Sequence, residues 1–260
     1  MARPMSDLSG TVAVVTGGNR GLGLVIARTL LERGASVCIA ARGVESLELA
    51  RNDLGPDRTL AVQADVSRPA DVSHLIAEAG HLGPVGIVVN NAALAGPTLP
   101  AHEMPPDEFE AVIAANLIGP FLVAREALPG MIERREGSIV NIGSIAGVEA
   151  YPLRSPYCVS KWGLHGLTRT LAAEVGPYGI RVNLVAPGPT EGERAFTVIS
   201  QRAEALGRPF EELRDEYAQA IPLRRFVRPH EVAEAVAFLV SSAASGITGQ
   251  SFCVSGGIEI

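Results

Sequence analysis

Residues 11–23 read TVAVVTGGNRGLG, and they decide which fold this chain can adopt. The apolar run TVAVVT (11–16) is typical of a buried strand, and it ends at a pair of glycines. From Leu22 onward the apolar residues fall at helical spacing, which predicts a helix closed by Gly34. A strand that runs through a glycine-rich turn directly into a helix is the first unit of an open α/β sheet.

The same rhythm continues along the chain, without a linker or an internal repeat. Further strands are predicted at 36–41, 59–64, 85–90, 137–143, 180–186 and 250–255, and further helices near 44–54, 69–80, 106–134, 156–176 and 230–241. Strands joined by crossover helices predict right-handed βαβ units. We therefore expect one α/β domain over 1–260: a doubly wound parallel sheet (Rossmann fold) of about seven strands with helices on both faces. A charged, mostly helical segment at 190–222 breaks the rhythm and is the expected substrate lid.

Composition argues against several classes of function. The net charge is −6 and the basic residues are scattered, so we expect no nucleic-acid surface. No apolar run approaches the roughly 18 residues that span a bilayer, so we expect no membrane association. The N-terminal segment MARPMSDLSG (1–10) lacks the apolar core of a signal peptide.

Cysteine and histidine usage points to the cytoplasm. Cys38, Cys158 and Cys253 are far apart in apolar surroundings, so we expect buried thiols in a reducing compartment. The five histidines show no metal-ligand spacing, and no metal is expected. These features together predict a soluble cytoplasmic protein.

The glycine turn has the composition of a phosphate cradle. Gly17, Gly21 and Gly23 would let the backbone approach a pyrophosphate, and the helix that follows offers its free N–H groups to the anion. A simple strand–helix turn is the alternative, but the strand before and the amphipathic helix after favour dinucleotide binding.

The end of the second strand bears on which dinucleotide binds. An NAD site would have an acidic residue there to hold the ribose diol, whereas this sequence has Ala40, Ala41 and Arg42, with Arg20 in the glycine turn. Two guanidinium groups suit a ribose 2′-phosphate, which favours NADP(H). The alternatives are solvated surface arginines, or Arg42 stacked on adenine.

The only lysine of the chain, Lys161, lies four residues after Tyr157 and so shares one face of the predicted helix with it. A neighbouring ammonium favours the phenolate form of a tyrosine, which otherwise titrates near pH 10. Ser144 ends the preceding strand and could donate a hydrogen bond to a carbonyl or alcohol oxygen. The three residues predict a proton relay beside a nicotinamide, although each alone also fits a cap serine, a core-edge tyrosine or a surface lysine.

Over essentially its full length the chain resembles the short-chain dehydrogenase/reductase family. The matching motifs are the turn at 16–23, DV at 65–66, NNA at 90–92, Asn116 in the long helix, NIGS ending at Ser144, Tyr157 with Lys161, RVNLVAPG ending at Gly188, and TGQSFCVSGG at the C-terminal end. The resemblance implies that Tyr157 is the acid–base group, that Ser144 binds the substrate oxygen, and that Lys161 binds the nicotinamide ribose. It also implies that Asn116 anchors a water of the proton path.

The expected catalytic residues are Ser144, Tyr157, Lys161 and Asn116. The expected cofactor residues are Gly17, Asn19, Arg20, Gly21, Leu22, Gly23, Arg42, Asp65, Val66, Asn90, Asn91, Ala92, Tyr157, Lys161, Pro187, Gly188 and Thr190. By resemblance, Asp65 and Val66 would hold the adenine, Asn91 would line the cofactor site, and Thr190 would contact the carboxamide. The cofactor is expected to be NADP(H), with NAD(H) as the alternative.

Three departures from the family pattern concern the shape of the site. Ala93 stands where the family usually has glycine, Gly192 where it usually has threonine, and Ser255 where an aspartate is common. None of them removes a catalytic group. We expect the segments 149–154 and 190–222 to select the substrate.

Several readings remain open at this stage. The leading one is an alcohol dehydrogenase or carbonyl reductase, of the 3-oxoacyl type, that acts on a small carbonyl or alcohol and assembles as a homodimer or homotetramer, as its relatives commonly do. The alternatives are the same reaction with NAD(H), or a dinucleotide-sensing regulator without turnover. An epimerase with a C-terminal substrate domain is not expected, since the chain ends at Ile260. The pairs at 134–135 and 224–225 could dock an acidic acyl carrier, or could be solvated helix ends.

Overall fold

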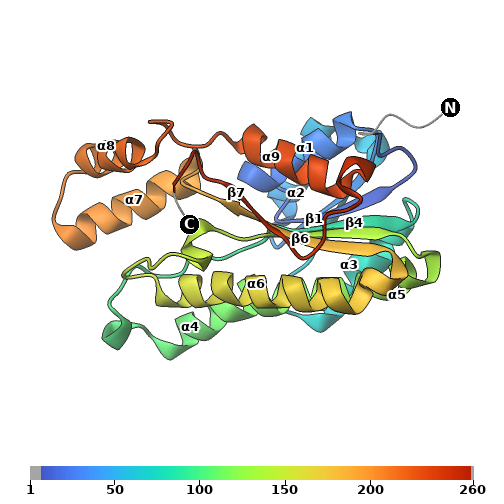
Figure 1. The fold of residues 1–260 in the computed structure, drawn as a ribbon, viewed down its shortest axis with the longest axis horizontal. Helices are drawn as coiled ribbons and strands as arrows, with labels where there is room; N and C mark the ends of the chain where they lie inside the picture. Colours follow the sequence, from blue (N-terminus) through green and yellow to red (C-terminus); the bar gives the residue numbers. More distant parts are fainter. Residues whose placement is uncertain (1–6, 259–260) are drawn as a thin grey trace.

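The structure, a computed structural model, describes residues 7–258, so the first six residues of the N-terminal segment lie outside it. Within these residues the core is one sheet of seven parallel strands in the order β3-β2-β1-β4-β5-β6-β7 (Figure 1). The order reverses direction between β1 and β4, which is the switch point where ligands bind in such sheets. The predicted doubly wound parallel sheet is confirmed.

Each predicted strand is present, with ends within one residue of the expected ones. The strands are β1 (Val12–Thr16), β2 (Ser36–Ala41), β3 (Thr59–Gln63), β4 (Val85–Asn90), β5 (Gly137–Ile142), β6 (Ile180–Pro187) and β7 (Ser251–Val254). The central strands are mostly apolar because both faces of the sheet are covered. In β1, for example, Ala13 and Val15 pack into one core layer, and Val12 and Val14 into the other.

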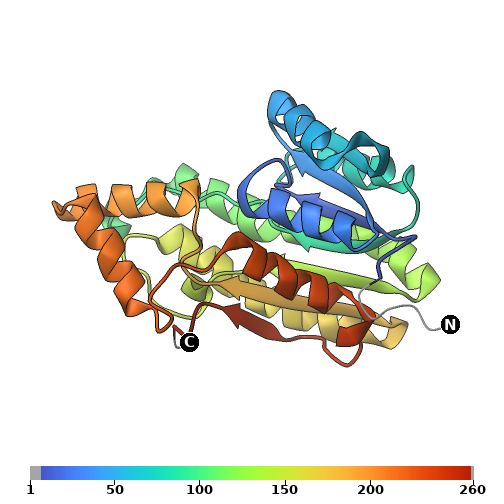
Figure 2. The same cartoon turned by 90° about the horizontal axis from the view of Figure 1, so that it is seen from above.

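Helices cover both faces of the sheet, as Figures 1 and 2 show. One face carries α1 (Gly21–Glu32), α2 (Val44–Leu54) and α9 (Pro229–Val240); the other carries α3 (Pro69–Gly80), α4 (Pro106–Ile113), α5 (Gly119–Arg134) and α6 (Ser155–Val175). The carboxyl ends of the strands lie toward the left of Figure 1, and the predicted motifs follow strands at that end.

The long helix predicted at 106–134 is continuous but contains one π-helical turn, Ala114–Ile118, between α4 and α5. By length and composition alone, the stretch Pro106–Arg134 is apolar enough to cross a membrane, with a mean hydropathy of 1.5 over its best window. The expectation that no run approaches a membrane span is therefore wrong. The apolar content has another explanation, because α5 packs against α3 and β4 in the core.

The segment 190–222 forms two helices, α7 (Glu193–Leu206) and α8 (Phe210–Ala220), which project beyond the sheet (Figure 2). They share a small apolar core of their own, built around Ile199, Ala203 and Leu213. At the base of this segment, Val227 N donates to Pro189 O at 2.9 Å and Glu191 N donates to Val227 O at 2.8 Å. We call residues 190–222 the lid segment.

The expectation of three buried thiols is correct for one cysteine. Cys38 lies in the interior strand β2 and is fully buried, and burial raises the pKa of its thiol to about 12. Cys158 is half-buried, and Cys253 is exposed. Cys253 is exposed because it lies in β7, an edge strand whose side chains are alternately exposed and half-covered. The apolar sequence of this strand does not reveal that it lies at the edge.

Candidate active site

The glycine turn after β1 approaches two other segments so closely that side chains cannot be accommodated. Gly17 has a φ of 65°, and a Cβ there would lie 2.9 Å from Asn91 Nδ2. A Cβ on Gly23 would lie only 2.1 Å from the carbonyl oxygen of Gly17. Glycine is therefore required for the turn to close onto the start of α1, and this open main-chain cradle suits a pyrophosphate.

The motif that follows β4 is tied to the same turn. Thr16 Oγ1 accepts hydrogen bonds from Asn91 N and Ala92 N, both at 3.0 Å, and Asn91 Nδ2 donates to Thr16 O at 2.9 Å. The side chain of Asn90 instead points into the core, where it donates to Asn141 Oδ1 at 2.9 Å. The structure thus brings Asn91 and Ala92 to the cofactor turn, whereas Asn90 has a structural role between β4 and β5.

Four other predicted residues of the turn have distinct surroundings. Asn19 Nδ2 donates to Ser46 Oγ at 2.8 Å, which links the turn to α2. Arg20 precedes α1 in an extended conformation and is exposed, and Leu22 packs against the core on the inner side of α1. Gly21 has a φ of 54°, which a glycine adopts without strain.

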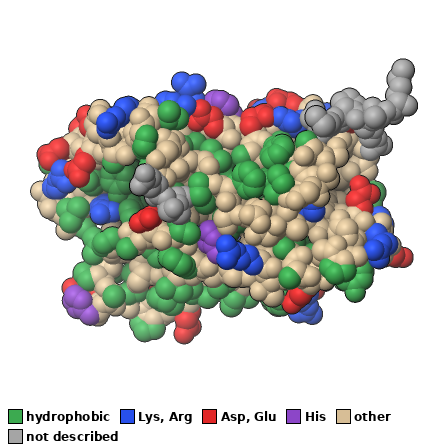
Figure 3. Space-filling model, in the orientation of Figure 1, with side chains coloured by type: hydrophobic (Ala, Val, Ile, Leu, Met, Phe, Trp, Pro, Cys, Tyr) green, Lys and Arg blue, Asp and Glu red, His purple; other side chains and the backbone are tan. Residues whose placement is uncertain are grey.

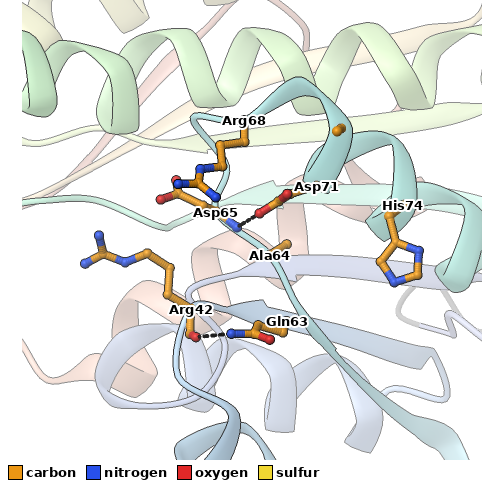
Figure 4. A pocket seen from close by; sticks show the side chains of 8 residues that line it. Arg42, Gln63, Ala64, Asp65, Arg68, Asp71 and His74 are labelled. Atoms are coloured by element: carbon orange, nitrogen blue, oxygen red, sulfur yellow. Dashed lines mark hydrogen bonds between the residues drawn. The ribbon is translucent and has the colours of Figure 1, made fainter.

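A pocket of about 540 Å³ opens beyond the ends of β2 and β3 (Figure 4). Its lining residues are Arg42, Gln63, Ala64, Asp65, Arg68, Ala70, Asp71 and His74. Figure 4 shows the Asp65 carboxylate beside the guanidinium of Arg68, with the guanidinium of Arg42 on the same side. Of the two arginines expected to meet a 2′-phosphate, Arg42 lines this pocket and Arg20 does not.

Asp65 is held as an ionised group in this pocket. Its burial alone would raise the pKa, but hydrogen bonds from Ser67 and the charges of Arg42 and Arg68 lower the pKa below its usual value. Ser67 N and Ser67 Oγ donate to Asp65 Oδ1 at 3.0 and 2.7 Å. An ionised, oriented carboxylate can accept a hydrogen bond from an exocyclic amine such as that of adenine. Val66 is 8 % exposed and belongs to the core.

The predicted catalytic residues come from two elements that pack together. Ser144 follows β5 and begins a short 3-10 turn, Ile145–Gly147, where its Oγ accepts from Ala146 N at 3.1 Å. This turn packs against α6, which carries Tyr157 and Lys161. Lys161 Nζ lies 5.7 Å from the centroid of the Tyr157 ring. The fold therefore brings the three predicted residues to one end of the sheet.

Asn116 lies in the π-helical turn and is fully buried. Its Oδ1 accepts from Leu94 N at 2.7 Å, while its Nδ2 donates to Leu94 O at 2.9 Å and to Ser160 Oγ at 3.1 Å. The π turn thus directs an amide that clamps the main chain just after the NNA motif. Such turns are frequent at functional sites.

The last predicted cofactor segment follows β6. Gly188 N donates to Val254 O at 3.0 Å, and Thr190 Oγ1 donates to Gly188 O at 3.0 Å. Pro187 ends β6, so these residues follow the carboxyl end of a strand, as the other motifs do, and lead into the lid segment.

Two arginines at the site were not predicted. Arg68 lines the pocket beside Asp65, and its signal in the sequence was a cation three residues after the aspartate of the DV motif. Arg154 is 3 % exposed, and its guanidinium carbon lies 5.3 Å from the Tyr157 ring centroid. Its signal was a charged residue within the otherwise uncharged stretch YPLRSPY (151–157).

Comparisons with known proteins cover almost the whole chain. Residues 17–259 match the family model described as enoyl-(acyl carrier protein) reductase. The 3-oxoacyl-[acyl-carrier-protein] reductase of Rickettsia prowazekii (strain Madrid E) is 39 % identical over 254 residues, which are 98 % of this chain and 99 % of the relative.

Solved structures match over nearly the whole chain as well. A variant of the actinorhodin polyketide ketoreductase with NADPH superposes with a TM-score of 0.92 at 35 % identity, covering 96 % of this chain and 97 % of that one. An NAD⁺-bound xylitol dehydrogenase superposes with a TM-score of 0.91 at 29 % identity, covering 96 % and 99 %. Similar folds thus accompany both nicotinamide dinucleotides.

Proposed function

Because the chain belongs to the short-chain dehydrogenase/reductase family, we propose that it transfers a hydride between NADP(H) and a carbonyl or secondary alcohol, with Tyr157 as acid–base group. The chain is an oxidoreductase of this family, and its cofactor is a nicotinamide dinucleotide. The observation that carries the finer proposal is the packing of α6, with Tyr157 and Lys161 on one face, against the turn that begins at Ser144.

The residues of the cradle fit the cofactor. The turn at Gly17 and Gly23 would receive the pyrophosphate, Asp65 the adenine, and Lys161 the nicotinamide ribose. When bound, NADPH supplies the hydride. The work of the protein is then to bind the substrate oxygen through Ser144 and to move a proton between that oxygen and Tyr157. In this proposal Asn116 anchors a water molecule that continues the proton path.

The preference for NADP(H) rests on charge. Arg42 and Arg68 both line the pocket at the end of β2, where Ala41 replaces a carboxylate that would repel a phosphate. Guanidinium groups bind phosphate through charge-assisted hydrogen bonds. The same reaction with NAD(H) is the second candidate, and the NAD⁺-bound neighbour is the observation that favours it.

For the substrate we propose a ketone of the 3-oxoacyl type. Support comes from the name of the 39 % identical relative and from the polyketide ketoreductase. The arginine pairs considered for docking an acyl carrier also bond within the chain. Arg134 donates to Val85 O at 2.7 Å, Arg135 donates to Pro177 O at 2.8 Å, and Arg225 pairs with Glu231 at 2.7 Å.

We also propose that the chain is a single domain whose lid segment closes over the substrate. In this segment the hydroxyl of Tyr217 hydrogen-bonds the hydroxyl of Tyr151. Arg202 lies over the Tyr151 ring at 4.8 Å and donates to Tyr217 Oη at 2.8 Å. These contacts join the two segments, 149–154 and 190–222, that we expect to select the substrate.

Assembly and compartment are further parts of the proposal. Large apolar side chains are exposed on the outer surfaces of α5 and α6, including Phe121 at 44 % and Trp162 at 54 %. Figure 3 shows hydrophobic side chains gathered along the lower edge, over α4 and the first turns of α6. A homodimer or homotetramer would cover such a surface. The cytoplasm is the proposed compartment, on the evidence of three free cysteines.

The decisive experiment is a panel of 3-oxoacyl thioesters, ketones and alcohols, followed by nicotinamide absorbance with each cofactor. We expect turnover with at least one ketone and NADPH, and loss of turnover in Tyr157→Phe with cofactor binding retained. Cofactor binding without turnover on the whole panel, in both directions, would favour the sensing regulator instead.

A further inference from the structure

Arg154 is a buried arginine at the start of α6, three residues before Tyr157. Arg154 is only 3 % exposed, and an arginine is almost never buried to this extent without specific partners. A guanidinium taken out of water has to recover its lost hydration through hydrogen bonds or charge interactions. The contacts of Arg154 therefore indicate what holds it there.

Its hydrogen bonds reach the segment that follows the NNA motif. Nη2 donates to Ala95 O at 2.7 Å, and Nη1 donates to Thr98 Oγ1 at 3.3 Å. Residues 94–99 have no helix or strand of their own and depend on such contacts. Asn116 holds the beginning of this segment through its hydrogen bond with Leu94. Arg154 holds the residues that follow, through Ala95 and Thr98.

The backbone just before Arg154 is bent in an unusual way. Leu153 has a φ of 69°, a left-handed conformation that a leucine rarely adopts and that is costly. Leu153 O accepts a hydrogen bond from Leu99 N at 3.0 Å, which secures the bend. This bend lies directly before the buried guanidinium, and strain of this kind tends to accompany functional sites.

The same guanidinium lies over the ring of Tyr157. The Arg154 Cζ is 5.3 Å from the ring centroid, and Lys161 Nζ is 5.7 Å from it. The spacing of four residues places Tyr157 and Lys161 on one face of α6, and Arg154 is the residue that precedes the helix. A cation within about 6 Å of a phenol ring attracts its π face and so restrains the ring.

We propose that Arg154 is a positioning residue for the reaction: it holds the Tyr157 ring and the segment 94–99 in one arrangement, so that the phenol hydroxyl meets the substrate oxygen. The inference rests on the proposed function of Tyr157. It assigns Arg154 no contact with the substrate or the cofactor. Its effect is on the rate of the chemical step, because misplacement of a catalytic group by about 1 Å can cost about a hundredfold.

The test compares Arg154→Met, which keeps the length of the side chain and loses the charge, with Arg154→Lys, which keeps a cation and a donor. Arg169→Met is the matched control, since Arg169 is exposed on the same helix. For each protein, kcat and KM are measured per NADPH-binding site, counted by calorimetric titration. Counting sites in this way removes any loss that comes from unfolded protein.

We expect kcat of Arg154→Met to fall about ten- to a hundredfold, with the NADPH Kd changed by less than about twofold. Arg154→Lys should recover part of this loss, and Arg169→Met should behave as wild type. If Arg154→Met matches Arg169→Met in kcat while Tyr157→Phe is inactive, the positioning role is wrong. If Tyr157→Phe itself stays active, the proposed function is wrong instead.

A second variant keeps the proposal testable if Arg154→Met does not fold. Thr98→Val removes one anchor of the guanidinium and leaves the charge in place. We expect its kcat per site to fall about two- to tenfold, as for the loss of one hydrogen bond. Unchanged kcat in both Thr98→Val and Arg154→Lys would overturn the proposal.

Discussion

The ammonium nitrogen of Lys161 donates a 2.7 Å hydrogen bond to the carbonyl oxygen of Ile142, the residue that ends β5. Ser144 lies two residues beyond that carbonyl. The bond therefore ties the helix that carries Tyr157 to the strand that delivers Ser144. Lys161 is 3 % exposed, which excludes the reading of a surface lysine left by chance.

The first prediction concerns this lysine. Lys161→Arg should lose most of its turnover, because a planar guanidinium is larger than an ammonium and spreads its charge away from Tyr157. Tyr157→Phe should lose more, by about 10²–10⁴-fold, as expected for a general acid–base group. The measurement is kcat per NADPH-binding site, with Arg169→Lys as the control on an exposed turn of the same helix. Unchanged turnover in Lys161→Arg would contradict the role.

The second prediction concerns the pocket at the end of β2. Wild type should bind NADPH more tightly than NADH, and Arg42→Ala and Arg68→Ala should each weaken NADPH selectively. One lost charge-assisted contact costs roughly 1.5–3 kcal/mol, which is one to two decades in Kd. Both cofactors are titrated by calorimetry against these variants, with the exposed Arg125→Ala as control. Equal affinities of wild type for the two cofactors would show that the pocket does not recognise a phosphate.

The third prediction concerns the lid segment. Burial and the neighbouring Tyr151 raise the pKa of Tyr217, so its hydroxyl is protonated and hydrogen-bonded at neutral pH. Tyr217→Phe should remove the hydrogen bond to Tyr151, which contributes about 0.5–1.5 kcal/mol to the stability of the lid segment. Hydrogen exchange across α7 and α8 should therefore become faster. KM should rise, because a looser lid holds the substrate less well. Tyr178→Phe, at an exposed tyrosine, is the control; lid exchange as slow as in wild type would mean that the tyrosine pair does not restrain the lid.

The fourth prediction concerns assembly. Trp162→Glu places a charge in the exposed apolar surface of α6 and should shift the protein to a smaller oligomer, because burying an unpaired charge is costly. Sedimentation velocity at several concentrations measures this. Leu49→Glu is the matched control, since Leu49 is 65 % exposed on α2, away from that surface. A wild-type protein that sediments as a monomer at all concentrations would contradict the proposal.

The elements of this fold could be predicted from the amino-acid sequence alone. Apolar periodicity located the strands and helices, as in TVAVVT and the helix after it. The spacing of apolar residues along a short stretch indicates which side chains a strand or helix can bury, so it needs no information from distant residues. The sequence also located the glycine turn and the pairing of Tyr157 with Lys161, since their spacing of four residues is local.

The way in which distant segments meet could not be predicted from the sequence and is seen in the folded structure. The structure showed that Arg154 reaches Ala95, that Arg68 joins Arg42 beside Asp65, and that Tyr217 of the lid segment meets Tyr151. It also showed that Asn90 turns into the core while Asn91 serves the glycine turn. Such contacts depend on the path of the chain between the partners and on which face each residue presents. Periodicity, which reports only the nearest residues in the chain, does not contain that information.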